Sequence, residues 1–138
     1  MKKIKQRSEC PISYSLDVLG DKWTLLIIRD MIFANKSSFG EFLQSEEKIA
    51  TNILADRLSV LESQGFVTKY VASDKKSKYT YSLTKKGISL LPVIMEITIW
   101  GATFNPFGGN EALLKKLKSD KVGTINKYRS ILMAHIRV

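Results

Sequence analysis

Cysteine and histidine, the side chains that hold many transition-metal ions in proteins, occur once each in this sequence, as Cys10 and His135. A zinc site needs three or four ligands at short spacing, so the sequence predicts no metal site. Gly108 and Gly109 form no phosphate-binding loop, because no strand-turn-helix pattern and no following Lys-Ser or Lys-Thr accompany them. No nucleophile is paired with a base. We therefore expect no catalytic residue, no metal and no cofactor, and hence no enzyme.

Cys10 is the residue whose own side-chain chemistry could matter. It precedes Pro11, which suits the first turn of a helix. A helix N-terminus favours a thiolate, whereas the neighbouring Glu9 opposes it. Two interpretations stay open: Cys10 is a possible redox sensor, or it is a small buried residue. A lone cysteine also excludes an internal disulfide framework and fits a reducing compartment.

A second group of residues could recognise nucleic acid. Residues 52–67, NILADRLSVLESQGFV, place three leucines on one side of a helix at roughly 100° per residue. Polar side chains, Asn52 among them, fall on the opposite side. An asparagine can pair bidentately with adenine, and an alanine such as Ala55 can touch a thymine methyl group. This stretch therefore has one face for a core and one face that could contact bases.

The charge of the chain points to the same class of partner. The sequence has 22 Lys and Arg against 13 Asp and Glu, a net charge of +9, which suggests a polyanion, nucleic acid before membrane. Three lysines, Lys75, Lys76 and Lys78, lie in the polar stretch SDKKSK. Charge alone does not identify the partner. The class of partner has to be inferred from the helices and strands that carry these residues.

Local patterns predict four helices in the first half of the chain. The second helix is apolar on almost all sides and is capped by Asp21, and the short third helix is capped by Ser38. A polar turn leads to the fourth, which Gly65 ends. The expected ranges are 11–19, 22–33, 39–45 and 52–64.

After Gly65 the apolar pattern changes from helical to alternating, which predicts a β-hairpin with the three lysines at its tip. Thr84 can then cap a long helix that continues to about Ile99 and is bent at Pro92. Two more helices follow, the first of them capped by Asn110. The expected hairpin strands are 66–72 and 79–84, and the expected last helices are 111–119 and 122–136.

A short helix, a polar turn, a second helix and a hairpin, in this order, are the plan of a winged helix-turn-helix. The expected fold class is mainly α with a small β-hairpin wing (α+β). With 138 residues, 44% of them hydrophobic, the chain supports one compact core. The 52–64 helix is the recognition helix of this plan: its leucine face packs on Ile27, and its polar face enters a major groove, which admits an α-helix.

Five stretches, in this order and spacing, resemble the HxlR-type family of bacterial transcriptional regulators over about residues 10–104. They are CPISYSLDVLGDKWTLLIIRDMIF, SFGEFLQ, ILADRLSVLESQGFV, YSLTKKGISLLPVI and IWG. The resemblance implies a cytoplasmic, homodimeric DNA-binding repressor or activator. It implies a single domain over residues 1–138, whose N-terminal helix and C-terminal helices, about 85–138, serve dimerisation. Some relatives use a cysteine at the position of Cys10 as a sensor of oxidants or electrophiles.

The chain departs from the pattern of this family at three places. Ala50 stands where members often have a small hydroxyl residue as the cap of the recognition helix, so the cap either moves to Thr51 or is lost. The wing tip lacks the prolines that are usual there. Glu46 and Glu47 lie in the turn before the recognition helix, where phosphates would repel them, so we expect them to point away from DNA.

The DNA-binding residues expected from this plan fall into three groups. Thr51, Asn52 and Ala55 lie in the first turns of the recognition helix, the part that reaches base edges. Arg57 follows the core side, so packing or a phosphate contact is expected of it. The phosphate group comprises Ser37 and Ser38 at a helix start, where plain capping is the alternative, and the wing residues Lys75, Lys76 and Lys78.

We expect a sequence-specific regulator that binds double-stranded DNA at a pseudo-palindromic operator, a homodimeric repressor that responds to redox or electrophile stress or to a small ligand. The alternative is a non-catalytic basic winged-helix module that binds a protein or RNA. Trp100, Phe104 and Phe107 either line a ligand pocket or belong to a dimer core. No stretch has the roughly 18 uncharged apolar residues of a membrane span, so we expect no membrane partner and a cytoplasmic protein.

Overall fold

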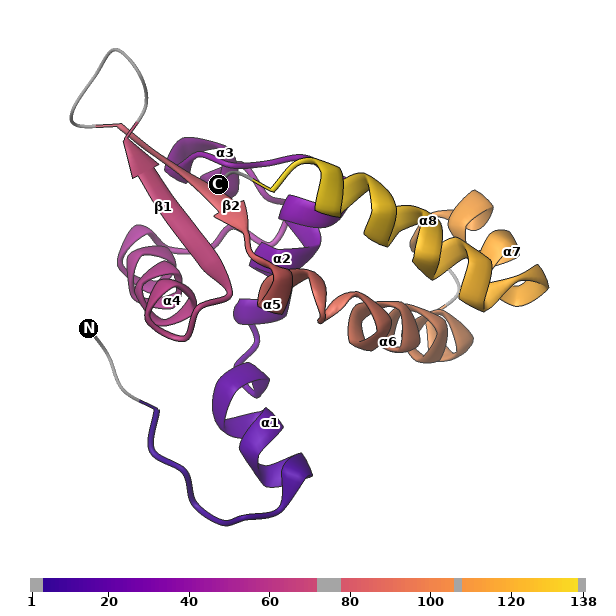
Figure 1. The fold of residues 1–138 in the computed structure, drawn as a ribbon, viewed down its shortest axis with the longest axis horizontal. Coiled ribbons are helices and arrows are strands. Elements are labelled where there is room, and N and C mark those ends of the chain that lie inside the picture. Colours follow the sequence, from indigo (N-terminus) through magenta and orange to yellow (C-terminus); the bar gives the residue numbers. More distant parts are fainter. Residues whose placement is uncertain (1–3, 72–77, 106–107, 137–138) are drawn as a thin grey trace. The chain divides into compact units, whose positions relative to one another are not determined.

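The computed structural model describes residues 4–71, 78–105 and 108–136 (Figure 1). The chain divides into two compact units, Met1–Thr84 and Lys85–Val138, and each is described by itself. The boundary falls directly after the hairpin, where the expected long helix begins. The first unit therefore carries the whole helix-turn-helix and the wing.

The first unit has the element order that the sequence predicts. Four helices precede a two-stranded antiparallel sheet, in which Val67 pairs with Leu83 and Val71 pairs with Tyr79. The elements are α1 (Pro11–Leu19), α2 (Thr24–Phe33), α3 (Phe39–Leu43), α4 (Thr51–Ser63), β1 (Val67–Val71) and β2 (Tyr79–Leu83). The mainly α fold with a hairpin wing is thus confirmed, while the wing tip, with Lys75 and Lys76, lies outside the described residues.

The core of this unit lies between α2 and α4. Ile28 of α2 is fully buried, and the three leucines of α4 are at most 1% exposed. The predicted leucine face is therefore a core face, and each leucine contributes about 1.5–3 kcal/mol through burial. Gly65, with φ +79°, lets the chain leave α4 sharply, and the Phe66 N–H donates to the Leu61 carbonyl at 2.9 Å.

The predicted helix caps are confirmed at three positions. Asp21 accepts hydrogen bonds from the Trp23 and Thr24 backbone N–H groups, each at 2.9 Å. Ser38 begins α3 with a capping box, and Asn110 accepts from the Leu113 N–H at 3.1 Å. Ala50 makes no side-chain cap, so α4 begins at Thr51 without one.

The second unit contains α5 (Lys85–Ile88), α6 (Leu91–Phe104), α7 (Glu111–Ser119) and α8 (Lys121–Ala134). The prediction of one long helix bent at Pro92 is wrong: the helix is interrupted at 89–90, and Pro92 lies in the first turn of α6. A proline has no N–H to donate, and the first turn of a helix needs no donor there, so Pro92 starts a helix instead of bending one.

Four large apolar side chains lie exposed along α6: Val93, Ile97, Trp100 and Phe104. Their spacing of four, three and four residues places them on one narrow side of the helix, which we call the α6 stripe. Trp100 and Phe104 are 69% and 72% exposed, and their ring centroids lie 5.1 Å apart. By length and composition alone Lys85–Phe104 could cross a membrane, but the core helix of a soluble protein also meets that test.

Candidate nucleic-acid interface

The outward face of α4 begins at its first turn. Thr51, Asn52 and Ala55 are exposed, and Asp56 and Ser59 are half-buried further along. Because Leu54 and its partners anchor the opposite side, these side chains are held at fixed positions on a rigid helix. The structure thus brings the three residues expected to contact bases together on one accessible surface.

The wing stands beside this face and forms a concave surface with it. A hollow of about 280 Å³ separates α4 from the hairpin, and its walls are Phe39, Ala55, Ser59, Glu62, Lys69, Tyr79 and Tyr81. Lys69 Nζ lies 4.0 Å from the centre of the Tyr79 ring, a cation–π contact. An adjoining hollow of about 390 Å³ extends past Ser38 to Lys78, the exposed lysine at the described end of the wing.

Sequence reasoning missed Lys69 and Tyr79 at this surface. The signal that could have found them was the hairpin register, which pairs Lys69 with Tyr81 and so brings the β1 lysine onto the aromatic strand. The wing also contacts the start of α3. The Tyr81 N–H donates to the Ser37 carbonyl at 2.8 Å, and the backbones of Ser38 and Thr80 form an isolated antiparallel β-bridge.

The N-terminal segment flanks α4 on the other side. Ile4 and Lys5 share a hollow of about 260 Å³ with α1 residues and with the α4 residues Asp56, Arg57 and Val60. The segment is held by Arg7, whose side chain forms an ion pair with Asp17. Helix α4 thus lies between the wing and the described part of the N-terminal segment, which contributes Ile4 and Lys5.

Arg57 is turned toward the core side, as the sequence indicated. Its Nε lies 3.5 Å from Asp21 Oδ2, and its Nη2 lies 3.7 Å from Asp56 Oδ2. Burial raises the pKa of Asp21, but hydrogen bonds from Thr24 and Trp23 and the charge of Arg57 outweigh it and leave that pKa below its usual value. Arg57 therefore ties α4 to the capped start of α2.

Ser37 and Ser38 already have an anionic partner. The Glu41 carboxylate accepts from the Ser37 and Ser38 backbone N–H groups at 3.2 and 3.0 Å, and Ser38 Oγ accepts from the Glu41 N–H at 3.2 Å. These backbone hydrogen bonds hold the pKa of Glu41 below its usual value. The capping interpretation of Ser38 is confirmed, and a phosphate at this helix start would have to displace Glu41.

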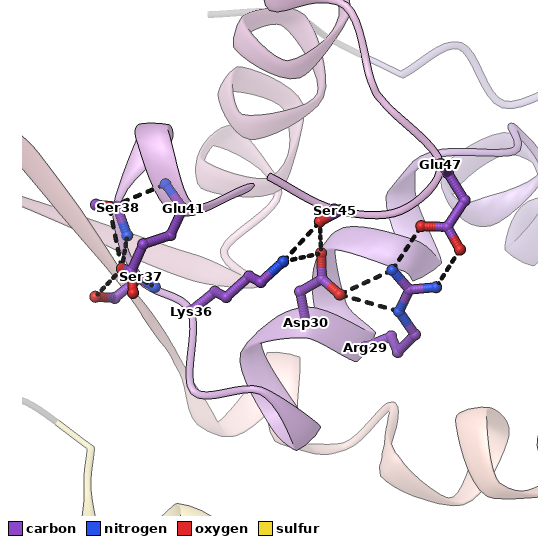
Figure 2. A network of polar contacts seen from close by, with 8 residues as sticks. All are labelled: Arg29, Asp30, Lys36, Ser37, Ser38, Glu41, Ser45 and Glu47. Atoms are coloured by element: carbon purple, nitrogen blue, oxygen red, sulfur yellow. Dashed lines mark hydrogen bonds and ion pairs between the residues drawn. The ribbon is translucent and has the colours of Figure 1, made fainter. Parts of the chain in front are cut away.

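A polar network joins the last turns of α2 to the turn before α4 (Figure 2). The Arg29 guanidinium donates to both Glu47 oxygens, at 2.7 and 2.8 Å, and to Asp30 Oδ1 at 3.0 and 2.8 Å. Asp30 accepts from Ser45 Oγ on its other oxygen, and Lys36 Nζ donates to Ser45 Oγ at 3.0 Å. Glu47 is thus turned toward Arg29, which agrees with the expected avoidance of phosphates.

The Arg29 contact has a consequence for acid stability. Hydrogen bonds from Arg29 lower the pKa of Glu47 to about 2, against about 4.3 in an unfolded chain. Because the folded state holds the proton more weakly, Glu47 stabilises the fold above pH of about 4.3, and this contribution is lost as the pH falls toward 2. Its side chain is 35% exposed, so solvent screening limits the contribution to about 1 kcal/mol or less.

Urea unfolding between pH 7 and pH 2 measures this effect. We expect Glu47→Gln to be less stable than the wild type at pH 7, and the difference in the free energy of unfolding to vanish by about pH 2. A difference that stays constant across this range would contradict the ionic role of Glu47.

Cys10 precedes α1 and is exposed, so the interpretation as a small buried residue is wrong for this chain. His135 is also exposed, and its Nδ1 lies 2.7 Å from the Ile131 carbonyl oxygen. Among the described residues no three His, Cys, Asp or Glu side chains gather as a metal site would require. The thiol is therefore accessible to reagents, and the histidine is engaged by its own helix.

Comparisons with known proteins agree with this geometry. The model of the HxlR-like helix-turn-helix family matches residues 18–107. The HTH-type transcriptional regulator YybR of Bacillus subtilis (strain 168) is 35% identical over 92 residues, which are 67% of this chain and 73% of that protein. Residues 108–138, with α7 and α8, lie beyond the family match.

Two solved structures of regulators are similar over most of their length. The redox regulator HypR in its reduced form is 32% identical with a TM-score of 0.61, and the match covers 68% of this chain and 92% of that one. Quinone-bound YodB from B. subtilis is 29% identical with a TM-score of 0.56, covering 68% of this chain and 99% of that one. Fold and sequence thus indicate the same class of protein.

Proposed function

The chain belongs to the HxlR-like helix-turn-helix family of transcriptional regulators, and on this premise we propose that it is a cytoplasmic, homodimeric repressor that binds a pseudo-palindromic operator. The observation that carries the proposal is the exposed first turn of α4, with Thr51, Asn52 and Ala55 beside a lysine-bearing wing. A helix in this setting can enter a major groove while the wing follows the backbone.

The site residues divide by the chemistry that they offer. Asn52 can pair with a base edge, Thr51 can donate to one, and Ala55 can contact a thymine methyl group. Lys75, Lys76 and Lys78 of the wing contact phosphates. Lys69, whose Nζ lies over the Tyr79 ring in the hollow, supplies a further positive charge for the DNA backbone. Arg57 acts through its contact with Asp21, and Ser37 and Ser38 reach phosphate only if Glu41 turns away.

The α6 stripe supports the dimer. Monomeric proteins seldom expose a continuous row of large apolar side chains, whereas a row of this kind can pair with the same row of a second copy about a two-fold axis. On α1, Ile12 and Leu16 are also exposed, 71% and 55%, one helical turn apart. A dimer places two copies of α4 in successive major grooves about 34 Å apart, which is why the operator is two-fold symmetric.

We further propose that an oxidant or electrophile controls the dimer through Cys10. The thiol is exposed and stands at the start of α1, which carries part of the proposed dimer surface. The similar regulators HypR and YodB are named as a redox regulator and as a quinone-bound form, and these names support an oxidant or electrophile effector here. A small ligand without thiol chemistry is the alternative effector.

The experiment is selection of genomic fragments at physiological salt by the reduced protein, by the diamide-treated protein and by Cys10→Ser treated in the same way. We expect the reduced wild type to recover a two-fold symmetric motif and to lose it after diamide, and Cys10→Ser to keep the motif under both conditions. A motif indifferent to diamide in the wild type would exclude Cys10 as the switch and favour a ligand. If no motif is recovered and binding lacks a steep salt dependence, the protein is instead a basic interaction module for protein or RNA.

A further inference from the structure

We propose that Arg29 and Glu47 are positioning residues that fix the start of α4 and thereby its sequence specificity for DNA. This inference rests on the proposed function and deepens it. Neither side chain is assigned a contact with DNA. They act through the turn between α3 and α4, which they join to the buried part of α2 (Figure 2).

Apart from these contacts, the turn is held by hydrogen bonds at Ser45, to which the Lys48 N–H donates through the Ser45 carbonyl at 3.0 Å, and by one buried side chain. Glu46, Glu47 and Lys48 are exposed, and Ile49, 8% exposed, is the turn's buried apolar side chain. Lys48 has φ +56°, a backbone conformation that an L-residue adopts at some cost. The helix that follows lacks a side-chain cap at Ala50. The devices that normally fix a helix start are therefore weak at α4.

The bidentate contact of the Arg29 guanidinium with Glu47, which we call the Arg29 fork, takes the place of a helix cap. Its Nη1 and Nη2 donate to the two oxygens of Glu47 at 2.7 and 2.8 Å, a bidentate arrangement that fixes orientation as well as distance. The fork is itself held by Asp30, whose side chain is 9% exposed and whose second oxygen accepts from Ser45, a residue on the same turn. The turn is thus attached to α2 at two points, through Ser45 and through Glu47, which lie two positions apart.

The other end of this chain of contacts is rigid. Arg29 and Asp30 lie on α2 between Ile28 and Met31, which are buried in the core. A helix anchored in this way does not shift easily, so the network transmits its position to the turn and to α4. Base recognition requires side chains within about 0.5 Å and 10–20° of the productive geometry, so a loosened turn costs specificity before it costs general affinity.

The test uses Glu47→Gln with Glu46→Gln as the matched control. Both variants remove one negative charge from the same turn, and the Arg29–Asp30 pair stays intact in both, so no buried charge is left alone. The first readout is amide hydrogen exchange over residues 45–52, which requires no DNA. The second is the ratio of affinities for the duplex that the wild type selects and for a scrambled duplex of the same composition.

We expect Glu47→Gln to exchange faster over residues 45–52 and its affinity ratio to fall by up to about fivefold, the limit that solvent screening of this half-exposed pair sets. Glu46→Gln should leave both readouts unchanged. Arg29→Lys keeps the charge but not the fork, so it should resemble Glu47→Gln.

Two results would overturn the inference. If Glu47→Gln changes affinity for both duplexes by the same factor, as Glu46→Gln would if charge alone mattered, Glu47 acts through the electrostatic field and not through position. If exchange over residues 45–52 matches the wild type, the turn is held by other contacts. If the wild type itself selects no motif, the proposed function fails, and hydrogen exchange alone then decides whether Glu47 holds the turn.

Discussion

Replacing Phe104 with Glu is expected to convert the protein to monomers and to weaken operator binding by about a hundredfold or more, because the second half-site then no longer contributes. In one protomer Phe104 is 72% exposed, so the carboxylate is tolerated there and the protomer keeps its fold. In a dimer formed through the α6 stripe, the same carboxylate would be buried against apolar side chains, which costs several kcal/mol. Light scattering at micromolar concentration and a titration with the selected duplex measure the two effects.

The matched control is Val122→Glu, which places the same charge on an apolar side chain of α8 that is 69% exposed. It should leave both the mass and the affinity unchanged. If Val122→Glu gives monomers and Phe104→Glu does not, the interface lies on α8 and the α6 stripe has another partner. A dimeric Phe104→Glu protein with normal operator affinity would remove the stripe from the proposed function.

Local signals in the sequence predicted most of the first unit. The leucine spacing of α4, the caps at Asp21 and Ser38 and the glycine at position 65 each act within a few residues, so their outcome does not depend on the rest of the chain. The same locality explains the one misassigned helix. Periodicity continues smoothly across residues 85–99, and the choice between a bend and a break at Pro92 depends on where the helix starts.

Contacts between residues distant in sequence were not predictable in this way. Arg57 meets Asp21 across 36 positions, counted from 21 to 57, and Arg29 meets Glu47 across 18. No pattern of charges along the chain distinguishes these pairs from the other combinations of 22 basic and 13 acidic residues. The sequence indicated that Glu47 avoids phosphate, but only the packing of the turn against α2 identifies its partner.

The exposure of Cys10 also depends on parts of the chain that are distant in sequence. A cysteine before a proline is compatible with a buried or an exposed thiol, and the choice depends on what covers the start of α1. In the first unit the start of α1 is open, which makes the chemistry of the thiol available. Whether the proposed partner copy leaves it open is what the diamide experiment with Cys10→Ser decides.

Replacing Asn52 with Ala is expected to flatten the sequence preference at one base pair of each half-site, with a loss of about 1–3 kcal/mol of discrimination. Asn52 is exposed in the first turn of α4, so the substitution leaves the core untouched. The measurement is selection from a randomised duplex library, compared with the motif of the wild type. Asn126→Ala, an exposed asparagine on α8, is the control and should select the wild-type motif.

Lys78→Ala separates base recognition from phosphate binding in the same assay. Removing a phosphate contact from each protomer should weaken all duplexes evenly, keep the motif and reduce the slope of log affinity against log salt by about 2, about 1 for each protomer of the proposed dimer. Asn52→Ala should do the reverse, changing the motif while the salt slope stays the same. If Asn52→Ala keeps the motif at full strength, base recognition does not come from the first turn of α4. The polar side of that helix would then face solvent, and the lysines of the wing would account for an electrostatic binding to DNA that does not depend on sequence.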